Sequence, residues 1–283
     1  MQMERVVALV TGASRGVGKG IALALLEQGA TVHVTARTLT KAQAASHPQE
    51  SGCLEELVEA ADALPGKLTI HVCDHQNDDE TVRVINSIHQ SGNLDILVNN
   101  AWPGYENMVE NNDFTWGRPF WEQPTWRWDA MMGVALRAAF VAARASAPDM
   151  IARRRGLIVN ISFWAAELYE GNAIYGMSKA AANKMAADFA HELRPHNVAA
   201  VALYPGLVRT EAVMRAAEYF DLSNSESPQF IGRVIAGLWR DRQLLEKSGK
   251  ALIAAKLAME FGISDINGYC PRPLTREDFG DTK

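Results

Sequence analysis

A tyrosine and a lysine stand four residues apart in the segment AIYGMSKAA, at Tyr175 and Lys179. On a helix, side chains at this spacing lie on one face and within reach of each other. An ammonium beside a phenol favours the phenolate, and so lowers the tyrosine pKa from its ordinary value near about 10. The pair could act as a general acid or base near neutral pH, or it could be an ordinary surface pair.

A glycine-rich turn stands near the N-terminus. The run TGASRGVGKG carries Gly12, Gly16 and Gly18 after an apolar, strand-like segment and directly before a helix-like one. Glycine allows a tight turn and lets the backbone and the helix N-terminus approach a pyrophosphate. A strand before the turn and a helix after it are the context that dinucleotide binding requires, so we expect a dinucleotide site. The alternative is a turn that is merely tight.

The end of the second predicted strand indicates which dinucleotide binds. An NAD site usually offers an acidic residue there to the ribose 2′-hydroxyl. In the run VTARTLT, Ala36 takes that position, Arg37 follows it, and the first acid further along is Glu50. Arg15 in the glycine turn adds a second guanidinium. Arginine forms charge-assisted bidentate bonds to phosphate, so the pattern predicts NADP(H) in preference to NAD(H).

Strand-like and helix-like segments alternate along the chain. Short apolar runs rich in β-branched residues, typical of strands buried on both faces, occupy residues 5–11, 31–36, 67–73, 94–100, 156–162, 197–204 and 250–254. Helical patterns lie between or after them at residues 17–28, 53–64, 78–90, 126–155, 173–194 and 228–239. This alternation predicts an α/β, Rossmann-type fold: a doubly wound, seven-stranded parallel sheet with helices on both faces. No repeat or long linker divides the chain, so we expect a single domain over residues 1–283.

Two segments break the alternation, and both follow the carboxyl end of a predicted strand, where open α/β sheets bind ligands. The first, residues 102–127, has no clean period and contains seven aromatic residues, Trp102, Tyr105, Phe114, Trp116, Phe120, Trp121 and Trp126. It is too aromatic for disorder and is predicted to close over an apolar substrate pocket, unless some of its tryptophans only fix it to the core. The second segment, residues 207–227, is predicted to be a lid.

Composition and charge exclude several classes of protein. The net charge is −5 and the chain has no basic tract, so we expect no nucleic-acid partner. Three scattered cysteines are too few for a disulfide scaffold, and no uncharged apolar run approaches the roughly 18 residues of a membrane span. His71, Cys73 and His75 alternate in one strand without a second ligand pair at metal spacing, so no metal site is predicted. A cytoplasmic protein without an integral membrane segment fits best.

Together these features resemble the short-chain dehydrogenase/reductase family over essentially the whole chain. The matching motifs, in order, are TGASRGVG at 11–18, Asp74, NNA at 99–101, Ser162, Tyr175 with Lys179, and PGLVRT at 205–210. Ser162 stands thirteen residues before Tyr175, which is the spacing of the family. More narrowly, the segments FWEQPTWRWD, AADFAHELR and SGKALIAAKLAMEFGISDINGY look like the dehydrogenase/reductase member 1-like branch.

The resemblance implies an oxidoreductase that interconverts a ketone or aldehyde and an alcohol by hydride transfer. Tyr175 would protonate the carbonyl oxygen, or act as the base in the oxidative direction. Lys179 would lower the tyrosine pKa and bind the nicotinamide ribose, and Ser162 would hydrogen-bond the reacting oxygen. The implied substrate is a small hydrophobic carbonyl or alcohol, and the enzyme would be a homodimer or homotetramer.

The resemblance also implies a set of binding residues. Asn99 would seat the cofactor ribose, Asp74 would touch the adenine, and Thr210 with the backbone of 205–208 would hold the carboxamide. The full cofactor set is Thr11, Gly12, Ser14, Arg15, Gly16, Val17, Gly18, Arg37, Asp74, Asn99, Ala101, Tyr175, Lys179, Pro205, Gly206, Val208 and Thr210. The expected substrate pocket consists of Trp102, Phe163, Trp164 and Tyr169.

One departure from the family pattern leaves alternatives open. Many members carry a catalytic asparagine in a run resembling W-D-x-x-x-x-V-N-L, and the run WDAMMGVALRAAF places Ala135 there. Either another group, such as a water held by backbone carbonyls near Gly133, completes the proton relay, or the protein is a weak catalyst. A non-enzymatic NADP(H) sensor or scaffold is the further alternative. Intact Ser162, Tyr175 and Lys179 argue against it, because cofactor binding needs neither the serine nor the phenol. The sequence does not set the direction of the reaction.

Overall fold

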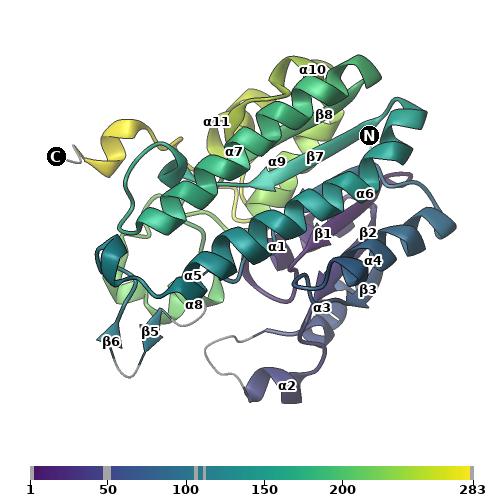
Figure 1. The fold of residues 1–283 in the computed structure, drawn as a ribbon. Helices are drawn as coiled ribbons and strands as arrows, with labels where there is room; N and C mark the ends of the chain where they lie inside the picture. The colour runs from purple at the N-terminus through teal and green to yellow at the C-terminus, as the bar shows by residue number, and fades with distance from the viewer. Residues whose placement is uncertain (1–2, 47–51, 105–107, 111–112, 281–283) are drawn as a thin grey trace.

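A seven-stranded, all-parallel sheet runs through the molecule (Figure 1). The computed structural model describes residues 3–46, 52–104, 108–110 and 113–280, so Glu50 and Tyr105 lie outside the described residues. Across the sheet the strands are β3 (Lys67–Val72), β2 (Thr31–Ala36), β1 (Val7–Thr11), β4 (Ile96–Asn99), β7 (Gly156–Ile161), β8 (Val198–Tyr204) and β9 (Ala251–Ile253). All seven predicted strands are present, each within two residues of its expected ends.

The strand order reverses direction between β1 and β4. From β1 the chain proceeds to β2 and β3 on one side, and from β4 to β7, β8 and β9 on the other. In this arrangement a crevice forms at the carboxyl ends of the two central strands, and ligands bind there in doubly wound sheets. The glycine turn follows β1 and the NNA run follows β4, so both motifs lie at this point.

Helices cover both faces of the sheet, which confirms the predicted fold class. One buried cluster joins the sheet to α1 (Gly16–Glu27), α3 (Leu54–Ala61), α9 (Pro228–Arg240) and α11 (Ala254–Phe261). The other cluster joins it to α4 (Asp78–Ser91), α6 (Arg137–Arg153) and α7 (Ala173–Leu193), on the face toward the viewer in Figure 1. Because side chains alternate along a strand, Ala8 and Val10 belong to the first cluster and Leu9 to the second.

The long helix expected over 126–155 consists of three parts. They are α5 (Thr125–Trp128), the π-helical η3 (Asp129–Leu136) and α6. Polar and apolar residues alone do not distinguish a π-helical turn from an α-helical one, because the two differ in which carbonyl each amide contacts. Within the described residues, Thr125–Arg153 is one helical stretch long and apolar enough to cross a membrane. This is weak evidence for a span, since core helices pass the same test and α6 packs on α4, β4 and β7.

The aromatic segment contains a small hairpin that its sequence did not predict. β5 (Val109–Glu110) pairs antiparallel with β6 (Asp113–Phe114). Strands of two residues are too short to show a period, so pattern analysis could not detect them. In Figure 1 this hairpin, α5 and α8 (Glu211–Arg215) lie at one end of the molecule, beyond the carboxyl ends of the strands.

Candidate active site

The cap of helix α7 sets the position of Tyr175. Asn172 is fully buried, and its side-chain oxygen accepts a hydrogen bond from the Tyr175 amide (3.0 Å). The amide group of the same side chain donates to the Trp116 carbonyl (2.9 Å). A side-chain cap of this kind stabilises a helix by about 1 kcal/mol. Asn172 therefore ties the tyrosine to the aromatic segment. Sequence reasoning missed it, although an asparagine just before a helical run is a recognised start signal.

Lys179 follows Tyr175 by one helical turn and is buried. Its Nζ donates to the Ile161 carbonyl at the end of β7 (3.3 Å) and lies 5.7 Å from the centre of the Tyr175 ring. The Trp102 ring covers the ammonium, with its centre 3.9 Å from Nζ. Burial lowers the pKa of Lys179 to about 7. Near neutral pH the side chain can therefore gain or lose a proton readily, and its charged form favours a phenolate at Tyr175.

Ser162 comes directly after β7 and completes the predicted catalytic set. Its amide donates to the Leu203 carbonyl in β8 (2.9 Å), which fixes the backbone at the carboxyl end of the sheet. Its hydroxyl donates to the Lys179 carbonyl (3.2 Å), so the serine lies against the first turns of α7. To donate a hydrogen bond to a reacting oxygen, the hydroxyl must rotate away from this carbonyl. The structure thus brings Ser162, Tyr175 and Lys179 together from β7 and α7.

An aromatic cluster surrounds Tyr175, which is only 6% exposed. Ring centres lie 5.4 Å away for Trp116, 5.8 Å for Trp102 and 6.4 Å for Phe163. Trp102 and Phe163 were expected in the substrate pocket, whereas Trp116 was expected only in the aromatic segment. Contacts of this kind pack the phenol and limit the access of water to it.

The other two expected pocket residues lie further out. Trp164 packs edge-on against Tyr204 at the end of β8, with ring centres 5.7 Å apart. The side chain of Tyr169 is more than half exposed. These two residues can therefore form the outer part of a pocket rather than its wall beside the phenol.

A buried arginine organises the aromatic segment. Arg127 is fully buried, and its guanidinium donates to the carbonyl (3.2 Å) and hydroxyl (2.9 Å) of Thr115. It also lies over two indoles, 4.9 Å from the ring centre of Trp126 and 5.8 Å from that of Trp116. These contacts hold the segment that carries Trp116 in one shape. No signal in the sequence sets this arginine apart from others.

The glycine turn is fastened to the end of β4. A side chain at Gly12, whose φ is +69°, would bring a Cβ to 2.7 Å from the Cα of Ala101. A Cβ at Gly18 would lie 2.4 Å from both the Gly12 carbonyl oxygen and the side-chain nitrogen of Asn100. The Asn100 side chain donates to the carbonyls of Thr11 (2.9 Å) and Gly12 (3.0 Å). Glycine is therefore required at both positions.

The turn leaves groups that fit a nucleotide. Gly16 begins α1 in the left-handed region (φ +56°), and its amide points to a carboxylate oxygen of Glu211 (2.9 Å). A helix N-terminus that already holds one anion is suited to a phosphate. The Asn99 side chain donates to Asn160 (2.9 Å), while its own buried Oδ1 has no hydrogen-bond partner in the described part of the chain. That oxygen can accept a bond from a ribose hydroxyl, so the residues present fit a dinucleotide.

The segment after β8 is held by a buried carboxyl group. Glu226 is 1% exposed and accepts a hydrogen bond from the Gly206 amide (2.8 Å). Its backbone pairs with the segment around Val208, since its amide donates to the Leu207 carbonyl (2.9 Å). Burial raises the pKa of Glu226 to about 8. Thr210 then caps α8 by accepting from the Val213 amide (3.3 Å).

The remaining predicted cofactor residues lie along the same edge. Thr11 accepts from the amides of Asn100 and Ala101 (3.0 Å each), so part of its role is to join β1 to β4. Asp74 closes the turn after β3 by accepting from Gln76 (3.0 Å). The others follow β1, β2 or β8 directly: Ser14, Arg15 and Val17 at the start of α1, exposed Arg37 after β2, and Pro205 after β8.

Comparisons with known proteins agree with this geometry. A family model for short chain dehydrogenases matches residues 6–219. Mouse Dehydrogenase/reductase SDR family member 1 is 37% identical over 281 residues, a match that covers 94% of this chain and 85% of the mouse protein. The 3-oxoacyl-(acyl-carrier-protein) reductase FabG of Thermotoga maritima is 31% identical over 221 residues, covering 77% of this chain and 80% of that protein.

A solved structure shows the same fold. It is a 3-oxoacyl-(acyl-carrier protein) reductase with bound NAD from Brucella melitensis, 26% identical, with a TM-score of 0.69. The match covers 88% of this chain and 89% of that chain. The chain is thus an oxidoreductase of a family that uses an NAD(P) cofactor, and it belongs to the short-chain dehydrogenases/reductases, within the dehydrogenase/reductase member 1-like branch.

Proposed function

We propose that this protein interconverts a small hydrophobic ketone or aldehyde and the corresponding alcohol, with NADP(H) as cofactor and Tyr175 as general acid or base. The observation that carries the proposal is the buried Tyr175–Lys179 pair beside Ser162, enclosed by aromatic rings at the carboxyl end of the sheet. A dinucleotide sensor would need neither the serine hydroxyl nor a buried phenol there. Catalysis explains why both are held in place.

The residues divide the chemistry between them. When bound, the cofactor supplies or accepts the hydride. In the reductive direction the Tyr175 hydroxyl gives its proton to the carbonyl oxygen, and charged Lys179 stabilises the phenolate that remains. The Ser162 hydroxyl donates to the same oxygen and orients it toward the phenol. The rings of Trp102, Trp116 and Phe163 limit water around these groups, which strengthens each of these interactions.

Preference for NADP(H) rests on two arginines. β1 and β2 are paired neighbours, with Thr11 opposite Thr35, so Arg15 and Arg37 follow adjacent strand ends. Two guanidiniums at this edge suit a 2′-phosphate. The Brucella relative holds NAD, so family membership alone leaves the choice between NAD(H) and NADP(H) open.

The rest of the molecule serves this site in our proposal. Residues 1–283 form one catalytic domain, in which 102–127 is the substrate loop and 207–227 the lid. Trp102 and Phe163 form the inner pocket, and Trp164 and Tyr169 its outer part. We expect a homodimer or homotetramer, because the chain resembles family members that work in this form. We expect a cytoplasmic location, because the few scattered cysteines suit a reducing compartment.

The test is reduction of a panel of carbonyl compounds, followed as loss of NADPH absorbance. Tyr175→Phe and Lys179→Met should each lower kcat by at least about a hundredfold. The first substitution removes the proton donor, and the second removes the charge that stabilises the phenolate. Lys184→Met is the matched control, since Lys184 is an exposed lysine of the same helix that pairs with Asp188, and it should leave the rate unchanged. NADPH should still bind Tyr175→Phe. Full activity in Tyr175→Phe would reject the proposed mechanism. NADPH binding without turnover of any carbonyl or alcohol by the wild type would favour a sensor.

A further inference from the structure

Phe279 packs against the two aromatic residues that follow the proposed catalytic serine. Its ring centre lies 5.9 Å from that of Phe163, edge-on, and 5.6 Å from that of Trp164. Phe163 in turn lies 6.4 Å from Tyr175. Phe279 is therefore two ring contacts away from the phenol, although it comes from a distant part of the sequence. Its side chain is half-buried, so part of the ring can meet a ligand.

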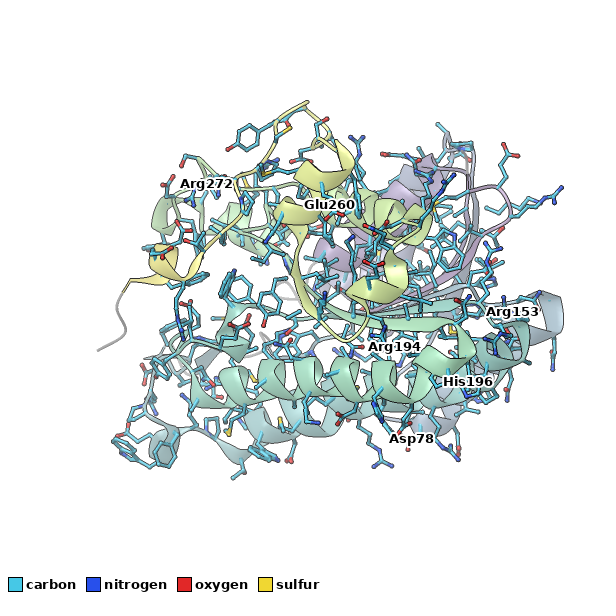
Figure 2. All side chains as sticks on the ribbon, turned by 90° about the horizontal axis from the view of Figure 1, so that it is seen from above. Asp78, Arg153, Arg194, His196, Glu260 and Arg272 are labelled. Atoms are coloured by element: carbon cyan, nitrogen blue, oxygen red, sulfur yellow. The ribbon has the colours of Figure 1, made fainter. Side chains whose placement is uncertain are left out.

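The C-terminal segment, residues 265–279, carries Phe279 and lies beyond the carboxyl ends of the strands. Figure 2 labels Arg272 on this segment, at the opposite end of the molecule from Arg153 and His196. Those two residues precede β7 and β8, so they mark the amino ends of the strands. The residues around Arg272 therefore extend beyond the carboxyl ends, on the same side as Ser162 and Tyr175.

The turn before Phe279 has a defined shape. It is the 3₁₀ helix η7 (Arg276–Phe279), which begins with a capping box in which Thr275 and Asp278 bond reciprocally, the Thr275 amide donating to Asp278 at 2.7 Å. The Arg272 guanidinium adds two hydrogen bonds to the Asp278 carboxylate (2.7 and 2.9 Å) and holds the pKa of that carboxyl well below its usual range. A bidentate pair and a cap on one carboxylate fix the direction in which the next side chain points.

The same segment is also bonded to the proposed lid, residues 207–227. The Asn224 side chain accepts from the Arg272 amide (2.8 Å) and donates to the Arg272 carbonyl (3.0 Å). Further back, the buried Asp265 carboxylate accepts from the Ser227 amide (2.8 Å) and from Arg209 (3.0 Å). The C-terminal segment is thus bonded near both ends of the lid and reaches the aromatic residues beside the active site.

We propose that Phe279 is a specificity-determining residue: its ring forms, with Phe163 and Trp164, an aromatic wall that binds the part of the substrate beyond the carbonyl. This rests on the proposed function. The wall selects ketones that carry a bulky apolar or aromatic group, because ring faces and edges offer large apolar contact area and no hydrogen-bond partner. Asp278 is a positioning residue, which acts only by holding Phe279 in place.

The experiment compares two ketones with the same reacting end, butanone and its phenyl-substituted counterpart benzylacetone. Phe279→Ala should raise KM for benzylacetone about tenfold and change KM for butanone less than about twofold, with kcat for butanone preserved. Arg276→Ala is the matched control, since Arg276 is exposed on the same turn, and it should change neither KM. Equal effects on both ketones, or none on either, would overturn the proposal.

A second variant tests whether the turn acts through Phe279. Asp278→Ala should also raise KM for benzylacetone selectively, by less than Phe279→Ala does. In the double variant Asp278→Ala should add nothing to the effect of Phe279→Ala, because the ring that it positions is gone. Additive effects would show that Asp278 acts elsewhere and would reject its positioning role.

Binding measurements separate this proposal from the proposed function. Benzylacetone should quench tryptophan fluorescence of the NADP+-bound wild type, which has no hydride to transfer, through Trp164, with a Kd about tenfold tighter than in NADP+-bound Phe279→Ala. If wild type and Phe279→Ala bind benzylacetone equally, the wall does not exist even where carbonyls are reduced. If the difference in Kd is present but neither ketone is turned over, the wall stands and the proposed reaction is what fails.

Discussion

Lys179 shows how one residue balances two opposing effects. Its burial lowers its own pKa to about 7, whereas a phenolate at Tyr175 would raise it, because the charged lysine is then paired. The ammonium is consequently favoured most when the tyrosine has lost its proton, which is the state that follows proton donation. The Trp102 ring over Nζ favours the charged form in the same way.

Arg37 carries the predicted choice of cofactor, and its replacement tests that choice. Arg37→Ala should weaken NADPH binding about tenfold to a hundredfold, because a charge-assisted pair with phosphate is worth about 1.5–3 kcal/mol. NADH binding should change little, since it lacks the 2′-phosphate. Titration of both cofactors measures this, with Arg83→Ala, an exposed arginine on α4, as control. Equal affinity of the wild type for NADPH and NADH would contradict the prediction.

Ala135 occupies the position of the asparagine in the family run W-D-x-x-x-x-V-N-L. It is 7% exposed and belongs to the π-helical η3, and π-helical turns are frequent at functional sites. If backbone groups already support the proton relay, Ala135→Asn should change kcat by less than about tenfold, or roughly 1.4 kcal/mol of barrier. Ala135→Val fills similar space without a hydrogen bond and separates steric effects from chemical ones. A hundredfold gain for the asparagine variant alone would show that the wild type lacks a substitute relay.

At the scale of elements, the regular part of the fold follows directly from sequence periodicity. The five inner strands of the sheet are buried on both faces, so each appears in the sequence as a short apolar run, and the partly exposed edge strands β3 and β9 are still apolar enough to be recognised. The Tyr175–Lys179 pair and the glycine turn were also found, because each is a local pattern. The contact between Asn172 and Trp116 and the ring contacts of Phe279 were not predicted, because they join segments far apart in the sequence. A local pattern does not indicate which loop will reach which strand end.

The proposed lid offers an example of such a distant contact. Glu211 begins α8, and its carboxylate accepts from the Gly16 amide at the start of α1. This is the helix end that we expect to bind the cofactor phosphates, so the carboxylate and a phosphate would compete for one donor and repel each other. In this conformation we therefore expect the Glu211 carboxylate to oppose cofactor binding.

Replacing Glu211 should relieve that opposition. Glu211→Gln should tighten NADPH binding about twofold to fivefold, since a charge at an exposed helix N-terminus is worth about 0.3–1 kcal/mol. Calorimetric titration measures the change, and raised salt should reduce it. Glu218→Gln, an exposed acid further along the same segment, serves as control. Weaker binding in Glu211→Gln would mean that the carboxylate assists the cofactor instead.

For the molecule as a whole, buried ionisable groups link stability to pH. Glu226 joins the segment after β8 to the start of α9, and its side chain faces the ion pair between Arg209 and Asp265. Burial raises its pKa from 4.5 to about 8, with Asp265 adding to the rise and the Gly206 amide and Arg209 opposing it. Between these two values the folded protein holds a proton that the unfolded chain releases, so folding stability falls as pH rises.

Glu226→Gln should remove this dependence on pH. The carboxamide that replaces the carboxyl group can still accept the bond from Gly206 but does not ionise, so the variant should match the wild type near pH 4.5 and become progressively more stable than it up to pH 8. A rise in pKa from 4.5 to about 8 corresponds to at most about 5 kcal/mol of folding stability lost by the wild type at pH 8. We therefore expect a Tm difference of several degrees at pH 8. Melting curves of both proteins across this range measure it. Glu218→Gln should follow the wild type throughout, because Glu218 is exposed. Lys179 titrates in the wild type and in Glu226→Gln alike, so it does not contribute to the difference in Tm between them. Parallel Tm profiles for Glu226→Gln and the wild type would show that Glu226 is not held protonated in the folded state.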